Sequence, residues 1–194
     1  MPVPLQLEQL AAALACSNNK WLGKTGLLEV LPVIASTNSY ALQLIDQGAT
    51  SGTLVLARQQ TAGRGRQGNE WHSPPDAGIY MSCIMRPQTS MDTWPLYTLA
   101  SGVAVAKAIE KYAGIRIGLK WVNDLVYKGM KLGGILAETR NRALVIGIGI
   151  NIHFDKNTIP AELVNRMTWL SAISDINDDN IDNNVNNIYS NKTK

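Results

Sequence analysis

Runs and spacings of apolar residues predict the elements of this chain. Apolar runs predict strands at residues 27–35, 53–58, 78–86, 115–121, 125–127, 131–138 and 143–153. Pro32 interrupts the first run, and because proline cannot donate a ladder hydrogen bond it places that strand at a sheet edge or a bulge. Helical spacing predicts helices at about residues 37–47, 94–113 and 161–173. The order indicates an α+β domain with a mixed, largely antiparallel sheet and helices packed on one side.

The segment 94–113 gives the clearest helical pattern. Apolar side chains recur there at spacings of three and four, and Gly114 follows as a stop signal. We expect one buried face made of Leu96, Leu99, Ala100, Val103, Ala106, Ile109 and Ala113. Leu7, Leu10 and Leu14 also fall at helical spacing and predict a short N-terminal helix that packs on the domain.

The last 21 residues differ in composition from the rest. Residues 174–194 hold seven Asn and four Asp, too little apolar surface to offset the entropy of ordering. We therefore expect one domain over residues 1–173 and a disordered tail over 174–194. The net charge of +3 is too small to argue for nucleic-acid binding by itself, although the mildly basic body suits an anionic substrate.

Cysteine and histidine usage narrows the chemistry. Cys16 and Cys83 are too widely spaced to make a disulfide framework, which favours a reducing, cytoplasmic setting. Cys83 lies in an apolar strand and is more typical of a core thiol than of a nucleophile. His72 and His153 are the only histidines, so no cluster has the spacing of a zinc site. No apolar run reaches the roughly 18 residues of a membrane span, and no basic signal-peptide region opens the chain.

A glycine- and arginine-rich stretch over residues 60–68 carries the strongest chemical signal. Gly63 and Gly65 allow close backbone approach to a ligand, and Arg64 and Arg66 can clamp phosphate or carboxylate oxygens. A flexible basic surface loop, or a loop that binds RNA, is the alternative at this point.

Two later stretches carry lysines. Lys120, with Asn123 and Asp124 at a turn, could organise a nucleotide phosphate and Mg²⁺, although Asn-Asp is also ordinary turn chemistry. Lys131 precedes two glycines, Gly133 and Gly134, which suits a charge placed against a ligand. The alternative there is a hairpin glycine pair beside a solvated lysine.

The last predicted strand contains alternating glycines. Gly147 and Gly149 would weaken a strand unless something packs closely against them. Either a flat ligand that lies on the strand or a helix that packs on small residues would explain them.

These stretches, in this order, resemble the biotin protein ligase family of the biotin/lipoate ligase superfamily. Ser36-Thr37-Asn38 at the start of the first helix and Trp71 after the glycine loop add to the resemblance, which spans about residues 27–153. It implies a fold similar to class II aminoacyl-tRNA synthetases. It also implies a cytoplasmic enzyme that uses ATP and Mg²⁺ to convert biotin into biotinyl-5′-AMP. Such an enzyme then transfers biotin to a lysine of a biotin carboxyl carrier domain, usually that of acetyl-CoA carboxylase.

The resemblance also implies a role for each matching residue. Lys131, Arg66 and Lys120 are the expected catalytic residues. The biotin-binding residues are expected to be Ser36, Thr37, Asn38, Gln60, Gly63, Arg64, Gly65, Arg66, Lys131, Gly134 and Ile135. The nucleotide is expected to contact Arg64, Lys120, Asn123, Asp124, Gly149 and Asn151, with Asp124 as a Mg²⁺ ligand. Trp71 is expected either to rest on the closed glycine loop or to be a core aromatic.

Three features depart from the family pattern. Val122 stands where the family usually has proline. The small C-terminal β-barrel domain usual in the family has no counterpart in the Asn/Asp-rich tail, which keeps open a truncated ligase with low turnover. About 26 residues precede the first predicted strand, too few for a helix-turn-helix domain, so no DNA binding is expected. A lipoate ligase or octanoyltransferase remains the nearest rival, and either a monomer or a homodimer is compatible with the sequence.

Overall fold

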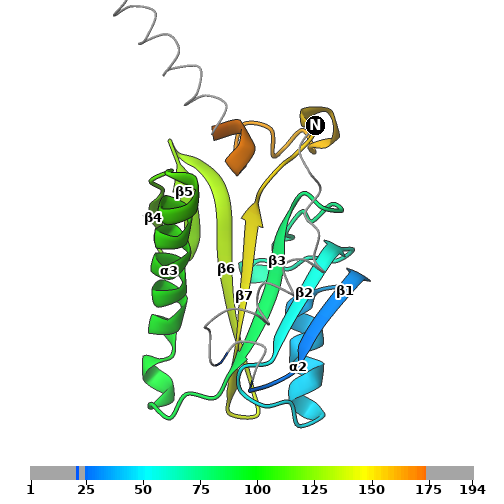
Figure 1. Cartoon of the computed structure of the whole chain (residues 1–194), viewed down its shortest axis with the longest axis vertical. Helices are drawn as coiled ribbons and strands as arrows, with labels where there is room; N and C mark the ends of the chain where they lie inside the picture. Colours follow the sequence, from blue (N-terminus) through cyan, green and yellow to red (C-terminus); the bar gives the residue numbers. More distant parts are fainter. Residues whose placement is uncertain (1–20, 22–24, 174–194) are drawn as a thin grey trace, which may run out of the picture.

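A computed structural model describes residue 21 and residues 25–173, which form one seven-stranded sheet with the order β1-β2-β3-β7-β6-β5-β4 (Figure 1). The strands are β1 (Leu28–Ile34), β2 (Leu54–Gln60), β3 (Gly78–Met85), β4 (Gly118–Lys120), β5 (Asp124–Tyr127), β6 (Met130–Arg140) and β7 (Ala143–Asn151). The helices are α2 (Thr37–Asp46) and α3 (Pro95–Ala113), with 3₁₀ turns η1 (Arg66–Gly68), η2 (Met91–Thr93) and η3 (Lys156–Thr158).

Only one pair of neighbouring strands in this sheet is parallel. β1 runs parallel to β2, and every other neighbouring pair is antiparallel. This confirms the prediction of a mixed, largely antiparallel sheet. β1 lies at the sheet edge, as Pro32 predicts. β6 and β7 form a long hairpin whose turn residues, Asn141 and Arg142, have φ angles of 47° and 55°, as in the tight turns that match strand twist.

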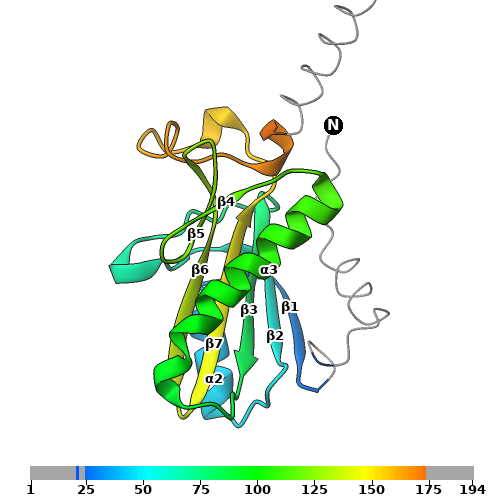
Figure 2. The same cartoon turned by 90° about the vertical axis from the view of Figure 1, so that its left-hand side faces the viewer.

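The two helices lie on opposite faces of the sheet, which differs from the expectation that helices pack on one side. Successive side chains of a strand point to opposite faces. On β7, Ala143 and Val145 belong to the cluster around α2, whereas Leu144 and Ile146 pack in the cluster that contains Val105 of α3. Figure 2 shows α3 in front of the sheet and α2 behind it. Each helix thus covers one face of the sheet, and the first turn of α2, with its buried Thr37 and Asn38, lies on the face opposite α3.

Helix α2 forms where the sequence predicts it. Ser36 caps its first turn with an extended backbone, and the Ser36 Oγ accepts a hydrogen bond from the Ser39 amide at 3.4 Å. The chain leaves the helix at Gly48, whose φ of 91° suits glycine. The cap places Thr37 and Asn38, both buried, at the edge of a cavity.

Helix α3 buries a face that is rotated from the predicted one and shares Ile109 with it. Gly102, Val105 and Ile109 are buried, whereas Leu96 and Val103 are 61% and 42% exposed. A helix with apolar residues on several sides does not show by spacing alone which side packs. The row with the small Gly102 lies nearest the sheet, where a Cβ on Gly102 would lie 3.4 Å from Leu119 Cδ2.

The predicted helix over residues 161–173 is wrong for most of its length. Residues 161–166 form turns, and helix begins only at Leu170. Instead, the Lys131 amide donates to Arg166 O at 2.9 Å and the Thr168 amide donates to Lys131 O at 2.8 Å. The backbone groups of Arg166 and Thr168 therefore bond to β6 and are not available for a helix. The predicted N-terminal helix and the predicted tail lie outside the described residues. Within the described part of the chain, no helix has the length and apolar character needed to cross a bilayer.

Candidate functional site

Two neighbouring cavities of about 220 and 660 Å³ lie where the predicted motifs meet. The first cavity is lined by Ser36, Thr37, Asn38, Gln60, Arg64, Gly65, Arg66, Gln67, Asn69, Glu70, Trp71, Met81, Asn123, Asp124, Lys131, Gly134, Ile135, Leu136, Gly147, Ile148 and Gly149. The second cavity includes Lys120 and Asn151 in its lining, together with His72, Arg166 and Met167. Both share Asn69, Glu70, Trp71, Asp124 and Lys131. Every predicted site residue except Gly63 lines one cavity or the other.

A polar network organises the inner wall of the first cavity. The Gln60 Oε1 accepts hydrogen bonds from the Thr37 amide at 2.8 Å and the Thr37 hydroxyl at 3.1 Å, and its Nε2 donates to Ser73 Oγ at 2.9 Å. The buried Ser82 Oγ lies 2.8 Å from Thr37 Oγ1 and 2.6 Å from Asn38 Oδ1. These bonds tie the start of α2 to β2 and β3. The groups that face the cavity are therefore oriented before any ligand enters.

Gly63 is buried but lines neither cavity. A Cβ at this position would lie 2.2 Å from Trp71 O and 2.6 Å from Ser73 Oγ. The Trp71 amide donates to Gly63 O at 2.9 Å, so the loop backbone folds directly against the Trp71 segment. Close packing of the protein on itself therefore requires a glycine at this position, and the contact of Gly63 with biotin stays a prediction.

The rest of the glycine loop crosses the first cavity. The Gly65 amide donates to Asn69 O at 2.7 Å and closes a small internal turn. Arg64 forms an ion pair with Glu138 at 2.8 Å, whereas the Arg66 Nη1 lies 3.5 Å from Asn123 Oδ1. Among the ion pairs of the described residues, none involves Arg66. The two loop arginines therefore differ: a carboxylate balances Arg64, and Arg66 remains available to an anion.

Lys131 and Asp124 lie at the junction of the two cavities. The Lys131 Nζ lies 2.7 Å from Asp124 Oδ1 and 5.4 Å from the centre of the Trp71 ring, within cation–π range. The backbone of Lys131 is fixed by the segment 166–168 and by Asn151, whose Nδ2 donates to Lys131 O at 3.4 Å. Lys131 is thus held on a rigid strand and paired, which excludes the alternative of a lysine that is merely solvated beside a hairpin.

Asn123 and Asp124, at the start of β5, have different roles. Asn123 is structural in part, because its Nδ2 donates to Ile135 O at 2.9 Å and its backbone oxygen accepts from the Ile135 amide at 2.9 Å. Asp124 instead directs its carboxylate to Lys131. Lys120 is exposed and faces only the second cavity. The peptide bond between Trp121 and Val122 is cis. Turn chemistry alone therefore explains Asn123 but not Asp124.

The alternating glycines of β7 accommodate the protein's own side chains. A Cβ on Gly147 would lie 2.1 Å from Asn38 Oδ1, and a Cβ on Gly149 would lie 2.6 Å from the Trp71 ring. Gly147 thus fits the packing of a helix on small residues. At Gly149 the flat group that lies against the strand is the indole of Trp71. The indole Nε1 of Trp71 is buried and has no hydrogen-bond partner among the described residues. Trp71 forms part of the boundary between the cavities.

Sequence reasoning missed Glu138, Ser82 and Met81. Glu138 pairs with Arg64 and also accepts a hydrogen bond from the Asn38 Nδ2 at 2.9 Å. Strand alternation from Gly134 could have placed Glu138 on the cavity face. Ser82 and Met81 belong to β3, whose mainly apolar sequence carries no comparable signal.

The described residues offer no cluster of three or more His, Cys, Asp or Glu side chains that could hold a metal. Asp124 is a single carboxylate already paired with Lys131. Mg²⁺ commonly binds through one or two carboxylates together with substrate phosphates. The site therefore fits a Mg²⁺ ion that arrives with a nucleotide, and it does not fit an all-protein metal cage. Cys83 is buried, and burial raises the pKa of its thiol to about 12, which agrees with a core thiol.

Comparison with known proteins agrees with this geometry. The model of the biotin/lipoate A/B protein ligase family matches residues 30–155. The bifunctional ligase/repressor BirA of Bacillus subtilis is 44% identical over 144 residues, covering 72% of this chain and 44% of that protein. The biotin–[acetyl-CoA-carboxylase] ligase of Mycobacterium tuberculosis is 36% identical over 130 residues, covering 64% of this chain and 49% of that protein.

A solved structure of the biotin protein ligase from Aquifex aeolicus in complex with biotin and ATP is also similar. Its TM-score is 0.65 at 34% identity, over 76% of this chain and 60% of that one. The chain spans about half the length of the curated relatives that it matches. Since the family model covers well over half of the sequence, this chain belongs to the biotin/lipoate A/B protein ligase family.

Proposed function

We propose that this chain is a biotin protein ligase. It activates biotin with ATP to biotinyl-5′-AMP and transfers biotin to a lysine of a biotin carboxyl carrier domain, such as that of acetyl-CoA carboxylase. The supporting observation is the pair of adjoining cavities that meet at Lys131 and Asp124. One cavity suits a small polar ring with a carboxylate tail, and the other suits a nucleotide.

In this proposal the first cavity holds biotin. The Ser36, Thr37 and Asn38 side chains face its inner wall, and Gln60 fixes Thr37. The backbone at Gly65, Gly134 and Ile135 also lines this cavity. The biotin carboxylate would then point toward Lys131. The second cavity holds the nucleotide, with Lys120 placed for phosphate and Asn151 and Gly149 supporting the junction.

The reaction requires positioning and charge stabilisation, and no nucleophile of the enzyme takes part. A biotin carboxylate oxygen attacks the α-phosphorus of ATP, and the bond to pyrophosphate breaks. Lys131 and Arg66 stabilise the negative charge on the acyl and phosphoryl oxygens. The neutral amine of the carrier lysine next attacks the biotinyl carbonyl carbon, and AMP leaves with the former carboxylate oxygen. Bound Mg²⁺ would supply charge neutralisation on the phosphates, and Asp124 would help to hold it.

The proposed activity also bears on the acceptor, the oligomeric state and the location of the protein. The acceptor is a protein domain, and a monomer or a homodimer can present the same site. A cytoplasmic location suits both the ATP requirement and a carboxylase acceptor.

The test is biotin-dependent exchange of labelled pyrophosphate into ATP, with lipoate and octanoate offered separately. We expect exchange with biotin and none with the other two acids. Loss of one charge-stabilising donor typically lowers the rate by roughly 100- to 1000-fold. We therefore expect Lys131→Ala to lose most of its exchange.

Lys128→Ala is the matched control. Lys128 is an exposed lysine in the β5–β6 turn that lines neither cavity, so its removal should leave exchange near that of the unmodified protein. Near-normal exchange in Lys131→Ala would contradict the role of Lys131. Exchange that depends on lipoate or octanoate instead of biotin would contradict the proposed substrate.

A further inference from the structure

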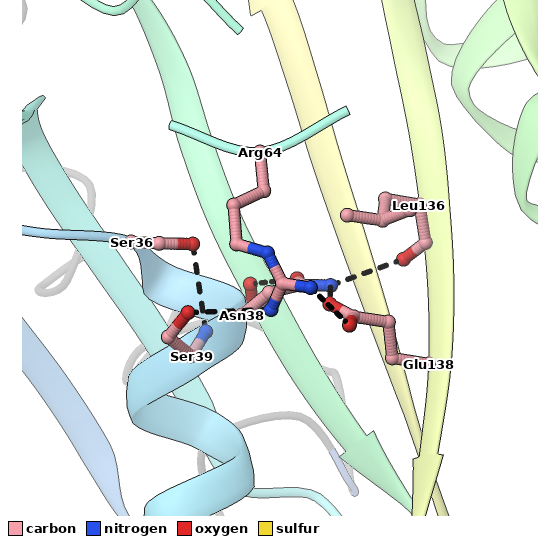
Figure 3. A network of polar contacts seen from close by, with 7 residues as sticks. Ser36, Asn38, Ser39, Arg64, Leu136 and Glu138 are labelled. Atoms are coloured by element: carbon pink, nitrogen blue, oxygen red, sulfur yellow. Dashed lines mark hydrogen bonds and ion pairs between the residues drawn. The ribbon is translucent and has the colours of Figure 1, made fainter. Parts of the chain in front are cut away.

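Among the ion pairs of the described residues, one joins the glycine loop to the sheet. Arg64 extends from the loop across the first cavity and reaches Glu138 on β6 (Figure 3). Glu138 is only 20% exposed at its side chain, and Arg64 is 46% exposed. The Arg64 Nη1 also lies 3.4 Å from Ser39 Oγ on α2. One guanidinium therefore connects the loop, the first helix and the sheet.

Glu138 also fixes the orientation of a cavity side chain. Its Oε2 accepts a hydrogen bond from the Asn38 Nδ2 at 2.9 Å, which directs the Asn38 Oδ1 toward Ser82. The same Nδ2 also donates to Leu136 O at the longer distance of 3.4 Å, so Glu138 supplies the shorter of the two bonds that set which way the amide faces. The two Glu138 oxygens thus hold two groups that line the cavity.

The charges show that Arg64 and Glu138 act together. An unpaired Glu138 would place a negative charge beside a cavity proposed to bind a carboxylic acid. The Arg64 guanidinium balances that charge, and its own positive charge is then balanced by Glu138. Arg66 and Lys131 remain for the anionic parts of the ligands.

We propose that Glu138 is a positioning residue that latches the glycine loop. Through Arg64 it holds the loop across the first cavity, and through Asn38 it orients the inner wall. In this assignment Arg64 acts as the latch arm and does not bind the nucleotide. The identity of the retained ligand rests on the proposed function, whereas the latch itself is a property of the free protein.

The first test is hydrogen–deuterium exchange of residues 61–71 in the ligand-free protein. Glu138→Gln keeps the size of the side chain and removes the ion pair. Loss of a partly exposed ion pair should raise exchange in this loop by about fivefold. Asp46→Asn is the matched control, because it breaks the Arg140–Asp46 ion pair away from both cavities. Unchanged exchange in Glu138→Gln would overturn the latch, whether or not the protein binds biotin.

The second test separates a latch from a general loss of structure. Arg64→Glu and Glu138→Arg each break the pair, whereas the double variant R64E/E138R restores opposite charges. We expect both single variants to raise loop exchange and to speed the dissociation of biotin, and the double variant to reverse part of both effects. A double variant at least as open as the single variants would overturn the proposal. If no variant or parent binds biotin while loop exchange follows this pattern, the proposed function fails and the latch stands.

Discussion

Replacement of Gly149 by alanine tests whether the Trp71 ring lies against β7. A Cβ at this position would lie 2.6 Å from Trp71 Cε2, 2.7 Å from Nε1 and 2.8 Å from Cζ2. A Cβ essentially never lies this close to a non-bonded heavy atom, so either the indole or the strand must move. Because Trp71 lines both cavities, the movement changes the shape of the proposed biotin and nucleotide sites together.

Two opposing effects decide how much Gly149→Ala changes the free energy of unfolding. Gly149 is not among the glycines with positive φ, so alanine can adopt its backbone and should gain about 0.4–1 kcal/mol by restricting the unfolded chain. Overpacking of a fitted position costs about 1–3 kcal/mol. Because the contacts are well under 3 Å, the cost should lie in the upper half of its range and exceed the gain, so we expect a net loss of about 1–2 kcal/mol in the free energy of unfolding. For a domain of this size that lowers the Tm by about 2–8 °C.

The assay combines thermal unfolding by circular dichroism with calorimetric titration of biotin. Gly134→Ala is the matched control on the neighbouring strand, where the nearest atoms to a new Cβ lie at 3.4–3.6 Å, an ordinary contact distance. It should keep or slightly raise the Tm. The reasoning is refuted if Gly149→Ala melts no lower than the parent and binds biotin with unchanged affinity.

Three further outcomes are expected. In Cys16→Ser protein, Cys83 should resist Ellman's reagent at pH 8 until the chain is unfolded, because burial raises its pKa to about 12; rapid labelling of the native protein would contradict this. The hydrogen bond from Arg58 holds the pKa of Asp76 below its ordinary value of 3.8, so this pair stabilises the fold above that pH and loses its effect as pH falls through the lowered value. The stability difference between the parent and Asp76→Asn, followed by urea unfolding, should accordingly shrink below about pH 4, and a difference that persists there would argue against the pair. Finally, Arg66→Gly should let biotinyl-5′-AMP escape, seen as free adenylate or as labelling of unrelated lysines; no rise in either would count against its role.

Elements whose partners are close in sequence could be predicted well. The hairpins at Lys128-Gly129 and Asn141-Arg142 appear where turn residues separate two apolar runs. The buried face of α3 and the segment 161–169 were predicted wrongly, because each depends on a partner that is distant in sequence. The buried row of α3 packs in one cluster with Leu144 and Ile146 of β7, and the backbone of Lys131 bonds to residues 166–168. Periodicity carries no information about such partners.

The candidate site shows the same division. Its motifs could be located because each has a local composition that is unusual for a strand or a loop. The sheet then brings them together: Gly134 pairs with Gly149 in register, and Asp124 pairs with Gly134. The sequence did not show that Trp71 would fill the space above Gly149, since that contact joins a loop to a strand almost 80 residues later.

The pairing of charges explains how a cavity rich in cations can exist before an anionic ligand arrives. Lys131 is paired with Asp124 and Arg64 with Glu138, so neither cation is left unbalanced at the cavity.

The two ion pairs differ in their exposure to water and in their further partners. The Lys131–Asp124 pair lies at the junction of the cavities with side chains 38% and 26% exposed, and ion pairs that water reaches contribute only about 0–1 kcal/mol. In the proposed function, a ligand carboxylate or phosphate would therefore displace Asp124 from Lys131 at small cost, and Asp124 would then be free to meet a cation bound to the nucleotide. The Arg64–Glu138 pair has the less exposed carboxylate and a second fixed partner in Asn38, so it should persist when the ligand binds. In the proposed reaction, the exchangeable pair lies beside the reacting atoms, and the lasting pair holds the glycine loop over the first cavity.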